Sequence, residues 1–276
     1  MTGMLDWDRL AIVWSHFEAT GLAPRDFEEV LPRMRDGVCV LVGAGQGYLS
    51  SMLCGPDRVV VPLDSSLAML HAGIRRRGIA GVASDGSKLP LRSGSAVGVI
   101  VSTGVLSPAG AEEAGRVLRE AARILRPDGL AVVAAFVLAG GWAEAGSEMG
   151  LIEGVWQRND RLLELYRAPA ALWADRVASW TGVLPSAAAQ TIARREGVLV
   201  RMVRRFDRVT ADLEALGFEA APFLDSALGR PVPVFRKEEL ESLIEESDLV
   251  VEELIERPLA DGIALHLCRR RGANLH

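Results

Sequence analysis

Cysteine is scarce in this chain of 276 residues. Only Cys39, Cys54 and Cys268 are present, far apart and without the short spacings of metal-ligand motifs. This scarcity excludes a disulfide framework and a cysteine-based metal centre. Cys39 and Cys268 fall within predicted strands, where a reduced cysteine packs as a small hydrophobe. We therefore expect no metal site and a reducing, cytoplasmic compartment.

Long apolar runs and a targeting segment are also missing. The longest apolar stretch, Leu130–Gly141, is shorter than the roughly 20 residues that cross a bilayer. Residues 1–8 include Asp6 and Asp8 and lack a basic region followed by an apolar core, so we expect no signal peptide. A net charge of -5 argues against nucleic acid or anionic lipid as the main partner. The sequence therefore predicts a globular protein with no membrane role, and it disfavours nucleic acid as a partner.

The chain does contain a regular alternation of strand-like and helical segments. Strands are predicted at 38–42, 58–63, 81–84, 97–103 and 130–136, and helices at 48–54, 66–77 and 112–125, the last closed by a turn at 126–129. This alternation is typical of βαβ units and a parallel sheet covered on both faces. From 237 a helix (237–246) and two strands (250–256 and 262–269) follow, and the short link between the strands predicts an antiparallel hairpin at a sheet edge.

The predicted fold class is α/β, with a doubly wound, mostly parallel, seven-stranded Rossmann-like sheet and an antiparallel last strand. We expect an N-terminal helical cap over 1–36, with one or two amphipathic helices at 5–34. The Rossmann-like domain is predicted over 37–136 and 234–276. Residues 137–233 interrupt the alternation with helical patterns rich in tryptophan, which predicts a helical lid insertion.

The most informative segment is Val40–Ser50, where a strand leads through Gly-x-Gly-x-Gly into a helix. Gly43, Gly45 and Gly47 leave the backbone bare, so that a ligand can approach it and the helix start can face a polar group. The alternative is a glycine turn that is only tightly packed. Asp64 ends the second strand, where an acid reaches ribose hydroxyls in doubly wound sheets. Its alternative is a cap for the next helix. Together the loop and the acid predict a nucleoside ligand.

The spacing within the loop narrows the kind of nucleoside. A dinucleotide fingerprint requires G-x-G-x-x-G, and here the third such position is Tyr48, whose side chain would crowd a pyrophosphate. The pattern therefore favours a ligand without a pyrophosphate. A nicotinamide (NAD)-dependent oxidoreductase remains a less favoured alternative.

Five stretches of the sequence carry a family resemblance. In order they are VLVGAGQG (40–47), LDSSLAML (63–70), ASDGSKLPLRSGSAVGVIVSTGVL (83–106), LREAARILRPDGLAVV (118–133) and FRKEELESLIEESDLVVEEL (235–254). In these stretches the chain resembles the class I S-adenosylmethionine-dependent methyltransferases. It is nearest the type 11 methyltransferases, which include the ubiquinone- and menaquinone-biosynthesis enzymes. The resemblance implies S-adenosyl-L-methionine as cofactor and methyl transfer to an O, N or C atom of a small-molecule acceptor.

The resemblance also implies roles for individual residues. The glycines would line the methionine portion of the cofactor, Asp64 would bind the ribose, and Asp85 would accept from the adenine amino group. Asp85 also suits an ordinary turn. Ser102 and Thr103 would border the sulfonium. The full implied cofactor-binding set is Gly43, Ala44, Gly45, Gly47, Asp64, Ser65, Ser84, Asp85, Gly86, Ser102 and Thr103.

Two positions depart from the family pattern. Leu41 and Val97 stand where the family usually has acids. This difference favours an alternative in which the chain is a catalytically degenerate binding or scaffold protein. We expect a general base only if the acceptor is protonated at rest, and His16 in the predicted cap is the candidate.

The predicted lid would enclose the acceptor and exclude water. Its candidate substrate contacts are Trp142, Glu144 and Tyr166, although lid tryptophans also suit the lid's own core. The sequence names neither the acceptor nor the atom methylated. It also leaves open a homodimer as a partner.

Overall fold

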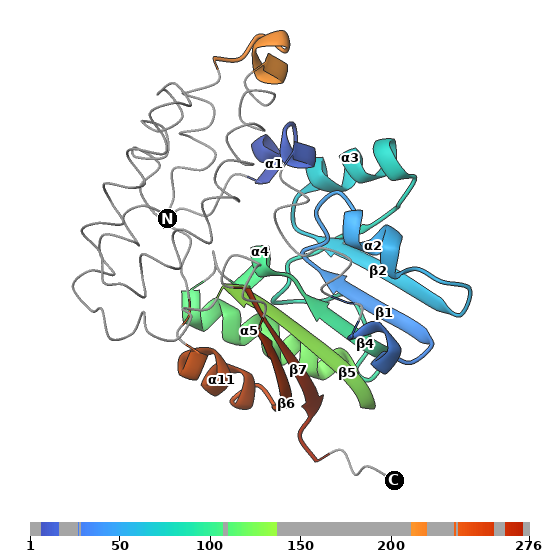
Figure 1. The fold of residues 1–276 in the computed structure, drawn as a ribbon, viewed down its shortest axis with the longest axis vertical. Coiled ribbons are helices and arrows are strands. Elements are labelled where there is room, and N and C mark those ends of the chain that lie inside the picture. The colour runs from blue at the N-terminus through green and yellow to red at the C-terminus, as the bar shows by residue number, and fades with distance from the viewer. Residues whose placement is uncertain are drawn as a thin grey trace, which may run out of the picture. The chain divides into compact units, whose positions relative to one another are not determined.

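The computed structural model describes residues 7–16, 27, 29–106, 110–136, 211–219, 235, 237–256 and 263–272 (Figure 1). The chain divides into two compact units. One comprises Trp7–Val137 and Pro233–His276, and the other Met1–Asp6 and Leu138–Val232. In the second unit the described residues are 211–219, of which 211–215 are helical. Most of the predicted lid therefore lies outside the described residues, and its boundaries stay a prediction.

The first unit contains a single seven-stranded sheet of order β3-β2-β1-β4-β5-β7-β6. Its strands are β1 (Gly37–Val42), β2 (Arg58–Asp64), β3 (Val82–Ala83), β4 (Ala96–Val101), β5 (Leu125–Phe136), β6 (Leu249–Glu256) and β7 (Ile263–Arg270). Strands β1 to β5 pair in parallel, whereas β7 is antiparallel to both β5 and β6. This confirms the predicted fold class and the hairpin at one edge of the sheet.

The helices of this unit follow the strands as expected. They are α2 (Tyr48–Leu53), α3 (Leu67–Arg77), α4 (Thr103–Leu106), α5 (Gly110–Ile124) and α11 (Lys237–Glu245). Helix α3 shows how local sequence sets an element's ends. The Ser66 hydroxyl accepts from the Met69 amide at 3.1 Å, and Gly78 ends the helix in a left-handed conformation.

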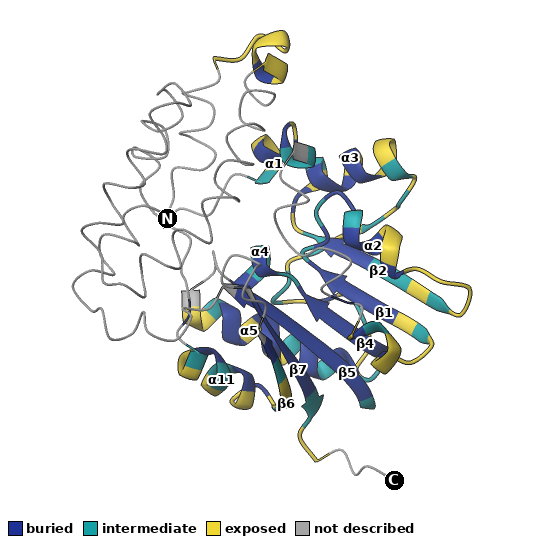
Figure 2. Cartoon of the chain, viewed as in Figure 1, coloured by how far each residue is buried: buried dark blue, intermediate teal, exposed yellow. Residues whose placement is uncertain are grey.

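Hydrophobic cores lie on both faces of the sheet. On one face Val40 and Val99 pack with Leu118 of α5. On the other face Leu41 and Ile100 belong to a second cluster that includes residues of α2. Figure 2 shows the central strands in the colour of buried residues. Because both faces are covered, all six residues of β4 are buried, and the strand is a continuous apolar run.

The N-terminal segment differs from the prediction. In place of an amphipathic helix, residues 7–16 form a single turn of helix, α1 (Trp7–Leu10), then a turn and the 3-10 helix η1 (Trp14–His16). A second 3-10 helix, η4 (Leu31–Arg33), precedes β1. The Ala11 carbonyl accepts a hydrogen bond from the Gln46 side chain at 2.6 Å. That carbonyl is therefore engaged outside the segment, where a continuing helix would use it for its own backbone ladder.

Two strand boundaries also differ from the prediction. Strand β4 ends at Val101, and Thr103 already begins α4. Strand β5 starts at Leu125, because Leu125 pairs with Ala96 and Leu130 pairs with Gly98. The predicted turn at 126–129 is thus a bulge within β5. The Arg269 guanidinium donates to the carbonyls of Asp128 (3.2 Å) and Gly129 (3.3 Å) in that bulge.

Candidate functional site

The order of the strands reverses between β1 and β4, at the centre of the sheet. Ligands of open α/β sheets bind at such a reversal, outside the carboxyl ends of the strands. The Ser102 amide donates to the Val42 carbonyl at 3.0 Å, which holds the loop after β4 against the loop after β1. A Cβ atom added to Gly43 would lie 3.3 Å from the Ser102 Cβ. The structure thus brings two predicted site residues together at the reversal.

Gly43 is required by both backbone conformation and packing. Its φ angle is +77°, and an added Cβ would meet Val105 Cγ2 at 2.2 Å. The amides of Gly43 and Ala44 both donate to the Leu63 carbonyl at 2.9 Å. The amides of Gly43 and Ala44 are therefore already used within the protein and cannot donate to a ligand. The glycine at position 43 is needed because a side chain would not fit against Val105.

Asp64 links three elements at the carboxyl end of β2. One carboxylate oxygen accepts from the Gly45 amide at 2.7 Å, and the other accepts from the Ser66 amide at 2.9 Å. The cap of α3 is Ser66 rather than Asp64. Burial raises the pKa of Asp64, the two amide bonds act in the opposite direction, and the charge of Asp8 raises it further. Each carboxylate oxygen keeps a lone pair, so the side chain can still accept from a ligand hydroxyl.

The loop after β3 carries Asp85. The Ser84 amide donates to the Asp64 carbonyl at 3.0 Å, which ties this loop to the end of β2. Asp85 is exposed, and its Oδ1 accepts from the amide and the hydroxyl of Ser87, each at 2.9 Å. These hydrogen bonds are those of an ordinary turn, which was the alternative role considered for Asp85. Gly86 packs near β1, since an added Cβ would lie 3.2 Å from Val42 Cγ1.

The remaining predicted residues fall in different places. Thr103 is buried at the start of α4, and Ser65 is exposed between β2 and α3. His16 ends η1. The lid candidates Trp142, Glu144 and Tyr166 lie outside the described residues.

Leu41 and Val97, where the family pattern has acids, are core residues. They are buried on the same face of the sheet, in the cluster that includes Cys39 and Leu49. A carboxylate at either position would be stripped of water in these surroundings. Their apolar side chains therefore contribute to packing rather than to a polar site.

Residues that the sequence did not single out also contact the site. A Cβ on Gly45 would lie 3.3 Å from Trp14 Nε1, and a Cβ on Gly104 would lie 3.5 Å from the Trp7 ring. The two tryptophans stand at an i, i+7 spacing, which would place them on one face of the helix predicted there. This spacing was visible in the sequence and could have drawn attention to the two tryptophans. It could not indicate which loops they contact.

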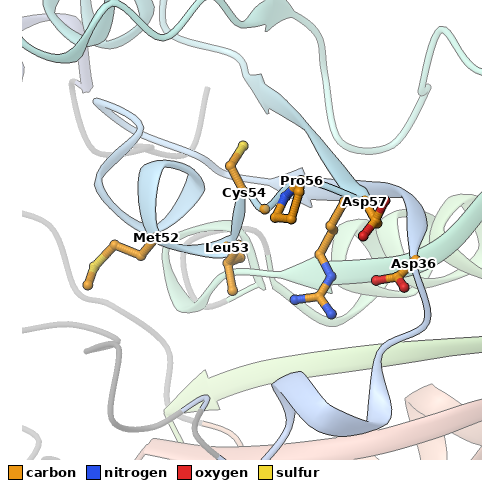
Figure 3. A pocket seen from close by; sticks show the side chains of 8 residues that line it. Asp36, Met52, Leu53, Cys54, Pro56 and Asp57 are labelled. Carbon is orange, nitrogen blue, oxygen red and sulfur yellow. The ribbon is translucent and has the colours of Figure 1, made fainter.

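A separate hollow lies at the opposite, amino-terminal ends of β1 and β2 (Figure 3). Its volume is about 190 Å³, below the roughly 300 Å³ at which small-molecule sites begin. It is lined by Asp36, Met52, Leu53, Cys54, Gly55, Pro56, Asp57 and Arg58. The Arg58 guanidinium there donates to the Leu31 and Met34 carbonyls, at 3.3 and 3.0 Å. Arg58 therefore has a structural role at the end of η4.

The strands and loops that form this site lie in a stretch that is similar to known proteins. Residues 40–133 match a family model described as a methyltransferase domain. A demethylmenaquinone methyltransferase of Beutenbergia cavernae is 36% identical over 135 residues, which make up 48% of this chain and 49% of that protein. The chain thus spans about half the length of this curated relative.

Solved structures share the fold at low sequence identity. An S-adenosylmethionine-dependent methyltransferase from Clostridium acetobutylicum is 9% identical, with a TM-score of 0.55 over 96% of this chain and 99% of the other. A Rhodobacter sphaeroides protein named for zinc-dependent alcohol dehydrogenases is 13% identical, with a TM-score of 0.57 over 98% and 100%. At these identities the likeness concerns the fold alone.

Proposed function

We propose that this chain is a class I S-adenosylmethionine-dependent methyltransferase that transfers a methyl group from S-adenosylmethionine to a small-molecule acceptor. The match of residues 40–133 to a methyltransferase-domain model and the similarity to a demethylmenaquinone methyltransferase support the proposal. One observation carries the proposal. The Asp64 carboxylate is held against the glycine loop by the 2.7 Å bond from the Gly45 amide, beside the reversal of strand order. An acid and bare backbone at that place suit a ribose and the chain attached to it.

The residues present fit the cofactor. Asp64 retains lone pairs for the ribose hydroxyls, and its half-buried position strengthens such hydrogen bonds. Asp85 has a second carboxylate oxygen beyond the one used in its turn, which we assign to the adenine amino group. Ser102 and Thr103, at the end of β4, are the proposed neighbours of the sulfonium.

Bound S-adenosylmethionine supplies a methyl group on a positively charged sulfur, which is already activated for transfer. The protein's main task is then to hold donor and acceptor in line, a contribution that reaches about 7–11 kcal/mol in favourable cases. The hydrogen bonds around Asp64 and Ser102 fix the loops that would do so. His16 is the proposed base for an acceptor that is protonated at rest.

The acceptor side of the proposal involves the segment between β5 and α11. We assign residues 137–233 to a helical lid that closes over a mostly apolar acceptor, with Trp142, Glu144 and Tyr166 as contacts. The described part of the chain has no helix that is long and apolar enough to cross a membrane. All three cysteines are free, which supports a reducing, cytoplasmic compartment.

Thermal unfolding with cofactor tests the binding half of the proposal. At about one hundred times Kd, S-adenosylmethionine stabilises the folded state by about 2.7 kcal/mol, which raises Tm by several degrees. Asp64→Ala should remove most of this rise. Asp57→Ala is the matched control, because Asp57 is an exposed acid just before the other end of β2. Absence of a shift with either S-adenosylmethionine or S-adenosylhomocysteine would contradict the proposal.

A transfer assay tests the catalytic half. With radiolabelled methyl donor and a panel of small acceptors, label should move to at least one acceptor in the wild type and not in Asp64→Ala. Binding without transfer to any acceptor would favour the degenerate scaffold protein instead. The apolar residues Leu41 and Val97 are the observation that favours this second candidate.

A further inference from the structure

Helix α3 packs directly against the backbone of the glycine loop. Figure 1 shows α3 beside α2, the helix that follows the loop. A Cβ atom added to Gly73 of α3 would lie 2.8 Å from the Gln46 carbonyl oxygen and 3.0 Å from the carbonyl carbon. Both distances are at or below the closest that real Cβ atoms reach, so only a glycine allows α3 to come this near to the loop.

Arg77, one turn further along α3, holds the same carbonyl. Its Nη1 donates to the Gln46 carbonyl oxygen at 3.2 Å, and its guanidinium carbon lies over the Tyr48 ring, 5.5 Å from the ring centroid. A cation within about 6 Å of a ring centroid is attracted by the ring face. Gln46 and Tyr48 flank Gly47, which has a left-handed conformation and caps α2. Arg77 therefore contacts the loop on both sides of the turn that leads into α2.

The start of α3 holds the preceding residue of the loop. Asp64 accepts from the amide of Ser66, the cap of α3, at 2.9 Å and from the Gly45 amide at 2.7 Å. Two successive loop residues, Gly45 and Gln46, are thus fixed from the two ends of one helix. The Gln46 side chain is 1% exposed and donates to the Ala11 carbonyl at 2.6 Å, so it is held on its other side as well.

We propose that Arg77 is a positioning residue for the methionine portion of S-adenosylmethionine. The inference rests on the proposed function and extends it to a residue outside the cofactor-binding set. Arg77 would act without touching the ligand, by fixing the backbone of residues 46–48 in the shape that the methionine portion needs. A loop held in its bound shape loses little conformational freedom when the ligand arrives. Where only a fraction of the molecules has that shape, the apparent affinity is reduced by that fraction.

This role predicts which ligands depend on Arg77. S-adenosylmethionine and S-adenosylhomocysteine both carry an amino-acid chain on the sulfur. Methylthioadenosine keeps the adenine, the ribose and the sulfur, but it has a methyl group in place of that chain. Loss of Arg77 should therefore weaken the two longer ligands alike and leave methylthioadenosine almost unaffected. A general loosening of the domain would weaken all three ligands.

Isothermal titration calorimetry with the three ligands tests the proposal without an activity assay. Arg77→Met should weaken binding of both longer ligands about 3- to 20-fold, and binding of methylthioadenosine less than about twofold. Arg77→Lys keeps the charge but not the planar guanidinium, so it should show the same pattern at about 2- to 5-fold. Arg76→Met is the matched control, because Arg76 is the exposed neighbour on α3, and all three affinities should be unchanged. Asp64→Ala should weaken all three ligands.

A double-mutant cycle separates positioning from direct contact with the ligand. If Arg77 acts through the loop, Tyr48→Leu should also weaken the two longer ligands selectively. The double variant, Arg77→Met with Tyr48→Leu, should then weaken them by less than the product of the two single effects, because both changes remove the same contact. If Arg77 bound the amino-acid chain itself, the two effects would multiply in full, and that result would overturn the positioning role.

The outcomes also separate the inference from the proposed function. Equal weakening of all three ligands by Arg77→Met, or no weakening of any, would overturn the inference while leaving the proposed function intact. If the wild type binds neither S-adenosylmethionine nor S-adenosylhomocysteine, the proposed function is wrong and the inference is wrong with it. Circular-dichroism melting checks that each variant folds, and Arg77→Lys remains decisive where Arg77→Met unfolds. Wild-type affinity of Arg77→Lys for both longer ligands would contradict the role of the planar contact with Tyr48.

Discussion

The Asp64 carboxylate and the Gly45 amide are joined by a hydrogen bond of 2.7 Å. The bond crosses from the end of β2 to the loop after β1, and the other carboxylate oxygen accepts from the start of α3. The side chain is therefore held in place by its own chain. A site fixed in this way loses little conformational freedom when a ligand arrives, which favours affinity.

The first prediction concerns the packing of the glycine loop. Gly43→Ala should be far more destabilising than Gly78→Ala, although both glycines have positive φ angles, +77° and +66°. At Gly78 an added Cβ meets nothing within 4 Å, so only the backbone strain of about 1–2 kcal/mol applies. At Gly43 it also meets Val105 at 2.2 Å, which adds roughly 1–3 kcal/mol of overpacking. Urea denaturation compares the two variants, and equal free energies of unfolding would contradict this packing.

The second prediction concerns the loop that carries Asp85. Arg123 of α5 donates to the Leu89 carbonyl at 3.1 Å and to the Leu91 carbonyl at 2.8 Å, and Glu120 accepts from the Leu89 amide at 2.7 Å. Arg123→Ala should lower the free energy of unfolding by about 1–3 kcal/mol, because two backbone carbonyls lose a charged donor. It should also weaken cofactor binding through the loosened loop.

Arg116→Ala is the matched control for that loss. Arg116 lies on the same helix, and within the described part of the chain its ion pairs are with Glu112 and Glu113 of α5 itself. Such pairs contribute little because water screens them. Urea denaturation and cofactor titration should therefore leave Arg116→Ala near the wild type. An equal effect of the two arginine variants would disprove the loop-holding role of Arg123.

The third prediction is a pH dependence of stability from His266. This side chain is fully buried on β7, and its pKa is lowered to about 4, chiefly by burial and then by the charge of Lys237. The Val133 carbonyl acts in the opposite direction. The unfolded chain binds the proton near pH 6.5, so the stabilisation from neutral His266 is complete above that pH. It is lost progressively as the pH falls from about 6.5 to about 4.

A buried replacement without a titrating group isolates this effect. Between pH 6.5 and pH 4, the free energy of unfolding should decrease by about 3 kcal/mol less in His266→Leu than in the wild type. His71→Gln, at an exposed position on α3, should keep the wild-type slope. Denaturant melts at a series of pH values measure both variants. A wild-type slope in His266→Leu would show that other groups are responsible.

The fourth prediction concerns thiol reactivity. Cys54 is exposed at the end of α2, whereas Cys39 and Cys268 are buried and free. Burial raises the pKa of both buried thiols, which further suppresses their reactive thiolate forms. A thiol reagent should modify one group in the folded protein and three after unfolding. Rapid modification of a second thiol under native conditions would contradict the packing of β1 or β7.

The parts of the fold that were predictable carry local signals. Ser66 and Gly78 delimit α3, and the apolar run in β4 indicates a strand buried on both faces. The fold class followed from the alternation of such segments. Asp64 and the glycine loop were found from local patterns, an acid at the end of one strand and closely spaced glycines after another. The structure places the glycine loop at the strand reversal, with Asp64 bonded to it from the end of β2.

The parts that were not predictable depend on contacts between distant segments. Nothing near Ala11 indicates that its carbonyl bonds to Gln46, and that bond accompanies the break in the expected N-terminal helix. Trp14 meets Gly45 only because the segment folds back over the loop. The bulge at 126–129 arises from the register of β5 against β4, where the sequence signalled only a turn.

Equilibrium dialysis of the purified chain against radiolabelled S-adenosylmethionine tests the proposed cofactor site most directly. We expect one bound molecule per chain, displaced by S-adenosylhomocysteine. We expect binding to be lost in Asp64→Asn, because an amide nitrogen cannot replace a carboxylate oxygen that accepts hydrogen bonds, and to be kept in Asp57→Asn. Absence of saturable binding by the wild type, or undiminished binding by Asp64→Asn, would contradict the cofactor role assigned to Asp64 and its neighbouring loop.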